Sequence, residues 1–176
     1  MTSYDLTLLV SGLDEALLDR VFEATDGVAN IELGDRWTST VGFDIEADTF
    51  ADAVLRAINE VEEVPGVTVV RVEPDQLVWA SEIADRVSRT RQSVDQLVKA
   101  KRGPGGFPPP VAGNGRNPLW RWLEVEAWFA AYENREIDTE RPTVIGAING
   151  ALEARRNLHA RPDPALAARL EALITA

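Results

Sequence analysis

The sequence predicts an α+β fold, and three observations lead to that prediction. The first third alternates strand-like and helix-like patterns of apolar residues. The middle third places two short helical patterns ahead of a hairpin signal, and the last third carries only helical patterns. We therefore expect three segments, residues 1–75, 76–134 and 135–176, with the first joint at Glu73-Pro74-Asp75.

The first segment opens with a strand followed by a helix. Leu6, Leu8 and Val10 alternate with other residues, which is typical of a strand with one buried face. Asp14 is placed to cap the helix, and Gly27 is placed to stop it. The apolar positions that should share one side of this helix are Leu17, Leu18, Val21 and Phe22.

Two more strands, a second helix and a last strand follow. The strands are predicted over Ala29–Leu33 and Thr38–Ile45, joined by a turn at Gly34-Asp35. Asp48 or Thr49 caps the second helix, Pro65-Gly66 ends it, and its apolar face consists of Phe50, Val54, Ile58 and Val61. With a short β-branched strand over Val67–Val72, the order becomes βαββαβ. That order predicts a ferredoxin-like domain, in which an antiparallel sheet carries both helices on one face.

Charge is distributed unevenly along the chain. Residues 1–75 hold 17 acidic and 4 basic side chains, residues 76–121 hold 3 acidic and 8 basic ones, and residues 122–176 hold 9 acidic and 6 basic ones. The local charge matters more than the total of −11, because screening weakens exposed charges beyond about 10 Å. The middle segment is therefore the candidate for a phosphate-facing surface, although so small a basic excess also arises by chance.

Two short helices are predicted in that basic segment. The first covers Ser81–Val87, and Ser88-Arg89-Thr90 interrupts it. Thr90 can cap a second helix that runs from Arg91 to about Lys99. The residues that should face inward are Ile83, Ala84 and Val87 in the first helix and Val94, Leu97 and Val98 in the second. Two helices joined by a tight turn, with a polar outer face on the second, are typical of a helix-turn-helix.

A hairpin and a further helix follow the second of these helices. The basic stretch 101–106 is too rich in Gly and Pro to continue a helix. Strands predicted over Phe107–Val111 and Leu119–Trp122 flank Asn114-Gly115, a strong signal for a two-residue hairpin turn. This hairpin would be a wing with Arg116 near its tip. A helix over Leu123–Ala131 should then turn Val125, Trp128 and Phe129 inward.

The middle segment resembles the excisionase-like and MerR-type winged helix-turn-helix regulators. The stretches that carry the resemblance are Glu82-Ile83-Ala84, Ser88-Arg89, Phe107-Pro108-Pro109-Pro110-Val111 and Trp120–Trp128. With its acidic front end and the stretch 102–108, the whole chain is also similar to a group of actinobacterial helix-turn-helix proteins. Two departures stand out. Leu123 occupies the position where a capping residue is usual, and Asp95 lies in the second helix, where we expect it at the edge or paired with Lys99.

The resemblance implies sequence-specific binding of double-stranded DNA, by a transcriptional regulator or an excisionase-like accessory factor. Of the polar residues around the second helix and the wing, we expect Arg91, Gln92 and Gln96 to read bases. The residues expected to hold phosphates are Arg89, Lys99, Lys101, Arg102 and Arg116. Thr90, Ser93 and Asn114 complete the expected DNA-binding set. Trp79, Trp120, Trp122 and Trp128 are expected to pack in the core and at the base of the wing rather than to stack on bases.

No residue pattern predicts an enzyme, a cofactor or a metal. The chain has no cysteine, and His159 is its single histidine, so thiolate chemistry and a histidine triad lack their residues. Gly103–Gly106 lacks the preceding strand and the Lys-Ser/Thr ending of a phosphate loop. No signal peptide and no run of the roughly 18 apolar residues that a membrane span needs is apparent, so we expect a cytoplasmic, nucleoid-associated protein.

The C-terminal segment is expected to form two helices. One starts near Pro142 with Val144, Ile148 and Leu152 on one face, and the other starts at Asp163-Pro164 with Leu166, Leu170 and Leu173 on one face. We expect these helices to join two copies of the chain in a homodimer, because one winged module offers only about 600–1,000 Å² of contact to DNA. The alternative is that they pack on Trp128 and Phe129 of the same chain.

The acidic first segment leaves a second function open. It could bind a basic partner while the helix-turn-helix serves only as a scaffold, which would make the chain a protein-interaction module. It could also compete with DNA for the basic segment, or only keep the protein in solution. Binding to DNA that weakens by orders of magnitude between about 50 and 200 mM salt would favour the DNA-binding hypothesis.

Overall fold

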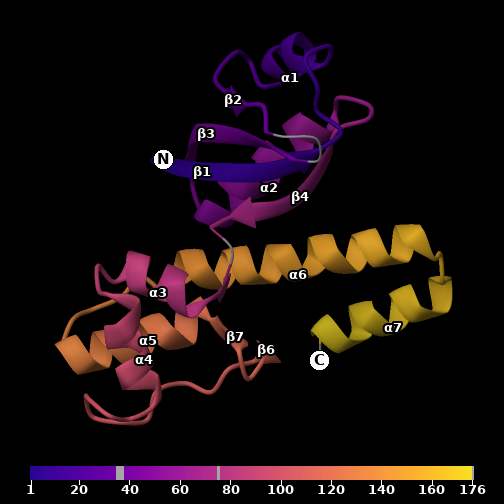
Figure 1. Cartoon of the computed structure of the whole chain (residues 1–176). Helices are drawn as coiled ribbons and strands as arrows, with labels where there is room; N and C mark the ends of the chain where they lie inside the picture. Colours follow the sequence, from indigo (N-terminus) through magenta and orange to yellow (C-terminus); the bar gives the residue numbers. More distant parts are fainter. Residues whose placement is uncertain (35–37, 75, 176) are drawn as a thin grey trace. The chain divides into compact units, whose positions relative to one another are not determined.

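The computed structural model describes residues 1–34, 38–74 and 76–175. It confirms a mixed α+β protein, in which the described residues form seven helices and two antiparallel sheets (Figure 1). The chain folds as two compact units. The first unit combines Met1–Glu73 with Ala147–Ala176, and the second is Pro74–Gly146. The predicted third segment, residues 135–176, is thus divided between the two units at Gly146.

A four-stranded antiparallel sheet forms the first unit, in the order β2-β3-β1-β4. The elements of this unit that precede residue 74 are β1 (Thr2–Ser11), α1 (Leu18–Ala24), β2 (Asn30–Glu32), β3 (Ser39–Ala47), α2 (Phe50–Glu62) and β4 (Thr68–Glu73). The long central strand β1 pairs with β3 from Thr2 opposite Ala47 to Val10 opposite Ser39. On its other side β1 pairs with β4.

The core of the first unit follows the predicted alternation. Leu6, Leu8 and Val10 are buried on β1, and every predicted apolar position of α2 is buried as well. Thr49, and not Asp48, caps α2, because the Thr49 hydroxyl accepts a hydrogen bond from the backbone N–H of Asp52. The apolar pattern of the sequence therefore predicted β1 and α2, two main elements of this core, correctly.

The first helix departs from the prediction at its start and in its apolar face. Asp14 accepts hydrogen bonds from the N–H groups of Ala16 and Leu17, so it stabilises a turn, and α1 begins only at Leu18. Phe22 was expected to share the apolar side of the helix with Val21, but Phe22 is 49% exposed whereas Val21 is fully buried. Gly27 ends the helix as predicted, with φ +72° and its N–H bonded to the carbonyl of Phe22. Asp35 of the predicted turn at Gly34-Asp35 lies outside the described residues, and so does Asp75 of the predicted joint at Glu73-Pro74-Asp75.

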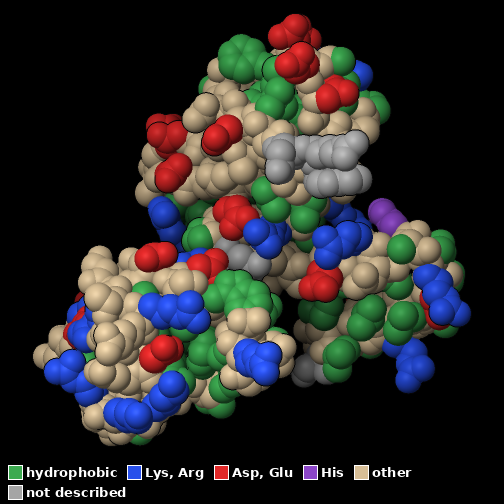
Figure 2. All heavy atoms as spheres, in the orientation of Figure 1, with side chains coloured by type: hydrophobic (Ala, Val, Ile, Leu, Met, Phe, Trp, Pro, Cys, Tyr) green, Lys and Arg blue, Asp and Glu red, His purple; other side chains and the backbone are tan. Residues whose placement is uncertain are grey.

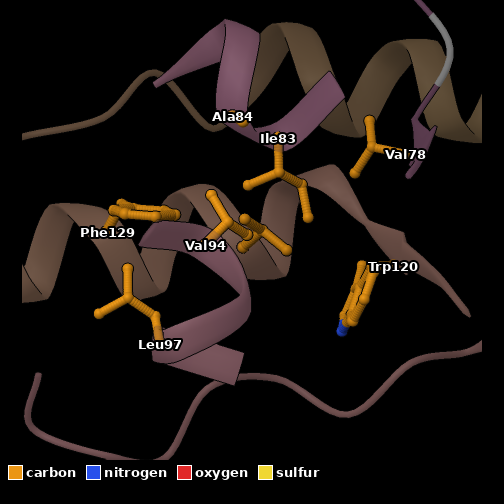
Figure 3. Packing of buried hydrophobic residues seen from close by; sticks show 8 residues of the cluster. Val78, Ile83, Ala84, Val94, Leu97, Trp120 and Phe129 are labelled. Carbon is orange, nitrogen blue, oxygen red and sulfur yellow. The ribbon is translucent and has the colours of Figure 1, made fainter. Parts of the chain in front are cut away.

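The second unit packs short elements around aromatic side chains. Its elements are β5 (Leu77–Val78), α3 (Ala80–Arg86), α4 (Arg91–Val98), β6 (Ala112–Asn114), β7 (Asn117–Arg121) and α5 (Trp122–Glu133), followed by the start of α6 (Glu140–Ala160). The three strands form an antiparallel sheet in the order β5-β7-β6. The core contains Trp120 and Phe129 together with Val78, Ile83, Val94 and Leu97, and in Figure 3 Ile83 and Val94 lie between the two aromatic side chains.

The hairpin of the second unit begins later than predicted. Phe107–Val111 is not a strand, because three consecutive prolines offer no N–H groups for a ladder. The first strand is instead β6, and Asn114 pairs with Asn117, so that the two turn residues are Gly115 and Arg116. Only Val111 keeps a strand-like bond, from its N–H to the carbonyl of Leu119.

Both C-terminal helices begin close to the predicted positions, at Asp163-Pro164 and near Pro142. Helix α6 starts at Glu140, and its buried residues are Ile145 and Leu152, while Val144 and Ile148 are half-buried. Within the first unit, Asn149 of α6 donates to the carbonyl of Val72 and accepts from its N–H. Arg155 forms two hydrogen bonds with Glu62 of α2. This half of α6 therefore packs on the first unit and not, as the alternative had it, on Trp128 and Phe129.

Candidate nucleic-acid interface

The predicted interface is built on α3, α4 and the tight turn between them. Ser88 adopts φ +51°, and the N–H of Arg89 bonds to the carbonyl of Ala84, which closes the turn directly behind α3. Ile83 on α3 and Val94 on α4 are fully buried and fix the two helices against each other. The polar face of α4 is consequently held at a defined angle on a packed core.

Helix α4 presents its polar residues as the sequence predicted. Arg91 and Gln92 are exposed in its first turn, Ser93 and Gln96 are half-buried, and Lys99 at its C-cap is exposed. The hydroxyl of Thr90 accepts a hydrogen bond from the N–H of Ser93, so the predicted cap is confirmed. Thr90 therefore stabilises the start of α4.

Asp95 and Arg89, two charged residues in or near α4, differ in their ion pairing. Within the described residues Asp95 forms no ion pair with Lys99, and its side chain is half-buried. The guanidinium of Arg89 bonds to the carboxylate of Glu133 at 2.9 Å and lies over the rings of Phe129 and Tyr132. Arg89 is thus directed to α5 rather than outward with the rest of the predicted set.

The stretch after α4 is held in place although it has no regular structure. The N–H groups of Lys101 and Arg102 bond to the carbonyl of Gln96, which turns the chain back. The indole N–H of Trp128 donates to the carbonyl of Gly105 at 2.9 Å, and that of Trp120 donates to the carbonyl of Pro108 at 3.1 Å. Lys101 and Arg102 are therefore exposed on an anchored loop.

Gly103 shows why this loop needs glycine. It adopts φ +75°, where other residues are strained, and a Cβ at this position would lie 2.9 Å from Cδ2 of Leu97. The loop thus comes too close to the core for a side chain. This closeness brings the basic residues 101 and 102 next to the end of α4.

Arg91 and Arg116 meet at a small hollow between α4 and the hairpin. The hollow has a volume of about 150 Å³ and is lined by Trp79, Ala80, Ser81, Arg91, Arg116, Asn117 and Pro118. The side-chain oxygen of Asn114 accepts from the N–H groups of Arg116 and Asn117, which fixes the turn that carries Arg116. Asn114 itself is committed to that turn.

Five basic side chains of this face lack acidic partners. Among the ion pairs of the described residues, none involves Arg91, Lys99, Lys101, Arg102 or Arg116. Figure 2 shows Lys and Arg side chains over the second unit with some Asp and Glu among them, whereas Asp and Glu predominate over α1 and the strands of the first unit. The face formed by these five side chains therefore carries a local excess of positive charge.

One lining residue of the hollow was missed by the sequence prediction. Trp79 was expected to pack in the core, but it is 43% exposed, while Trp120 is 2% exposed. The missed signal was local: Trp79 is the N-cap of α3, and its own N–H bonds to the side chain of Glu82. A residue at a helix start projects from the core more readily than one at the centre of a strand.

No three acidic or histidine side chains of the described residues are grouped so that they could hold a metal ion. No helix among the same residues combines the length and the apolar character that a bilayer crossing requires. No family model matches the chain, and neither do curated proteins or solved structures.

Proposed function

We propose that the protein binds double-stranded DNA through a winged helix-turn-helix, as a transcriptional regulator or an excisionase-like accessory factor and not as an enzyme. In this proposal α4 is the recognition helix and the β6–β7 hairpin is the wing. The observation that carries it is the set of five basic side chains without acidic partners, which surround the polar face of α4. A polyanion with regularly spaced phosphates is the partner that such a set would bind most strongly.

The arrangement of elements supports both parts of the fold proposal. In the first unit, the order βαββαβ occurs with the sheet order β2-β3-β1-β4 and supports a ferredoxin-like domain. In the second, a tight turn between α3 and α4, followed by a two-residue hairpin and a helix, supports a winged helix-turn-helix.

The positions of the side chains suggest a division of roles. Gln92 and Gln96 lie on the polar face of α4 and are proposed to read base edges, for which the side-chain amide is well suited. Lys99, Lys101 and Arg102 are proposed to hold phosphates on one side of the helix. Arg89 is proposed to position α5 against the turn, since Glu133 already holds its guanidinium.

Arg91 and Arg116 are proposed to share one phosphate at the hollow. A volume of about 150 Å³ is well below the roughly 300–1,000 Å³ of sites that enclose a small molecule. It suits a single group that projects from a larger partner. This differs from the expectation that Arg91 reads a base, and the base preference of an Arg91 variant separates the two roles.

The experiment is a selection of bound duplexes from a random library, followed by titrations with single variants. Gln92→Ala should reduce the preference at particular base pairs by about 1–3 kcal/mol. Lys101→Ala and Arg102→Ala should weaken binding to all sequences alike, and each should reduce the slope of log K against log salt by about 1. Arg20→Ala, an exposed arginine on α1, is the matched control and should bind as the wild type does.

Two outcomes would contradict the proposal. The first is that the wild type selects no duplex and binds none at low salt. The second is that Arg20→Ala weakens binding as much as Lys101→Ala, because the attraction would then come from charge in general and not from this face.

One observation favours a second candidate, a domain that binds a basic partner. Asp5 and Asp44 stand directly opposite each other on β1 and β3, and both are exposed. Like charges in such a pair destabilise a sheet, and a cationic partner would relieve the repulsion. Titration with an oligolysine peptide tests this: the double variant Asp5→Asn/Asp44→Asn should bind the peptide more weakly than the wild type and should bind DNA unchanged.

A further inference from the structure

Helix α7 (Pro164–Thr175) is apolar but has no buried residue. Leu166 is 46% exposed, Leu173 is 74% exposed and Ile174 is 77% exposed. Its start is well defined, because the Asp163 carboxylate accepts from the N–H of Leu166. An isolated helix of this length is only marginally stable in water, so most of its stability must come from packing on a partner.

Helix α7 folds back beside α6 (Figure 1). Side chains of the two helices line two grooves. The larger, of about 630 Å³, is bounded on its apolar side by Leu158, Leu166 and Leu170. The other, of about 360 Å³, continues from Leu158 and Leu170 to Ile174. Leu158 and Leu170 line both grooves, so the two grooves share an apolar boundary.

We infer that this α6–α7 pair binds the same pair of a second copy of the chain and so forms a homodimer. A two-fold axis brings the same patch together from both copies, so the patch must complement itself. It contains both halves of such a contact: two grooves with apolar lining, and a helix whose exposed Leu173 and Ile174 side chains can pack into the grooves of the other copy. The inference depends on these apolar contacts and not on the binding of DNA.

The charges of the patch favour a second copy over a partner of one sign. Residues 147–176 carry four basic and three acidic side chains, so a two-fold axis can bring opposite charges together. The larger groove itself is bordered by Glu153, Arg161 and Asp163. The first 75 residues hold 17 acidic and 4 basic side chains, so their surface would repel its own copy. Contact between two copies is therefore most favourable at the helix pair.

Sedimentation velocity of the full chain over a micromolar concentration range tests the inference. Removing the helices is unsuitable, because Asn149 and Arg155 of the same region pack on the first unit. The test variant is the double substitution Leu173→Glu/Ile174→Glu, at two side chains that are exposed within one copy. The matched control is Leu55→Glu on α2, which changes a side chain that is 51% exposed and lies outside the helix pair.

The wild type and Leu55→Glu are expected to sediment as dimers. The double variant should dissociate with a dissociation constant about 100-fold higher, because two apolar side chains would lose their burial. A wild type that stays monomeric at tens of micromolar would overturn the inference. So would a double variant that dimerises like the wild type, because the contact would then lie elsewhere. Circular dichroism spectra that match the wild type would show that both variants are folded.

Discussion

The two units of this chain form their hydrophobic cores in different ways. The first unit buries aliphatic side chains at regular spacing, with Leu8, Val41 and Val54 fully enclosed between sheet and helix. The second has short elements and long loops, and its core is organised around Trp120 and Phe129. The difference shows that regular hydrogen bonding can be replaced, over a short stretch, by aromatic side chains that pack and donate at the same time.

The indole groups are the clearest part of that comparison. In the first unit, the backbone groups of β1 bond to two neighbouring strands. In the second, the loop between α4 and β6 receives bonds from the indoles of Trp120 and Trp128, at Pro108 and Gly105 respectively. Each indole supplies apolar area and one donor, which suits a stretch whose prolines cannot donate.

The largest expected effect is that of Trp120→Ala. The substitution leaves a large cavity and removes the bond to Pro108, so it should lower the free energy of unfolding of the second unit by about 3–5 kcal/mol. Hydrogen exchange during guanidinium unfolding measures this, with lost protection confined to α3, α4 and α5. The counterpart Leu8→Ala should affect β1 and β3 instead. Equal loss of protection in both units after either substitution would mean that the two units unfold together.

A smaller effect is expected of Asn149→Ala, at the edge of the first unit. The amide of Asn149 satisfies both the N–H and the carbonyl of Val72. Its loss should lower the free energy of unfolding of the first unit by about 1–3 kcal/mol. Urea denaturation measures the change, and Asn59→Ala controls for helix propensity, since Asn59 is exposed on α2. If the two alanine variants were equally stable, the bonds to Val72 would contribute nothing measurable.

The smallest effect is expected of Trp128→Phe, which keeps an aromatic ring but removes the bond to Gly105. We expect a loss of about 0.5–1.5 kcal/mol, together with faster hydrogen exchange at residues 103–107 and little change in α5. Trp122→Phe is the matched control, because no described hydrogen bond uses its indole N–H. Unchanged exchange in the loop would show that ring packing alone anchors it.

The sequence predicted the regular elements better than the connections. The buried face of α2 and the Thr90 cap of α4 were correct because periodicity and capping are local properties. The prediction of a strand over Phe107–Val111 was wrong because its consecutive prolines lack the N–H groups that a strand donates, whatever the β propensity of the neighbouring residues. The prediction for Phe22 was wrong because the apolar pattern of a helix does not show how that helix packs on the rest of the unit.

The sequence predicted which basic residues belong to the candidate site but not how they are arranged in space. That basic residues gather near α4 follows from counting them. That Arg91 and Arg116 border one hollow depends on where the hairpin turns, since it turns at Gly115 and Arg116. The pairing of Arg89 with Glu133 joins residues 44 positions apart, and a single sequence carries no signal for it.

The course of the chain through α6 has a consequence for its synthesis. The second unit is one continuous stretch, and it interrupts the first unit between Glu73 and Ala147. On the ribosome, β4 and α2 are therefore complete long before Asn149 and Arg155, the residues that bond to them. The nascent first unit therefore lacks the hydrogen bonds of Asn149 to Val72 and of Arg155 to Glu62 until the second unit has been translated. A chain that stopped after residue 146 would therefore contain the whole second unit but only part of the first unit.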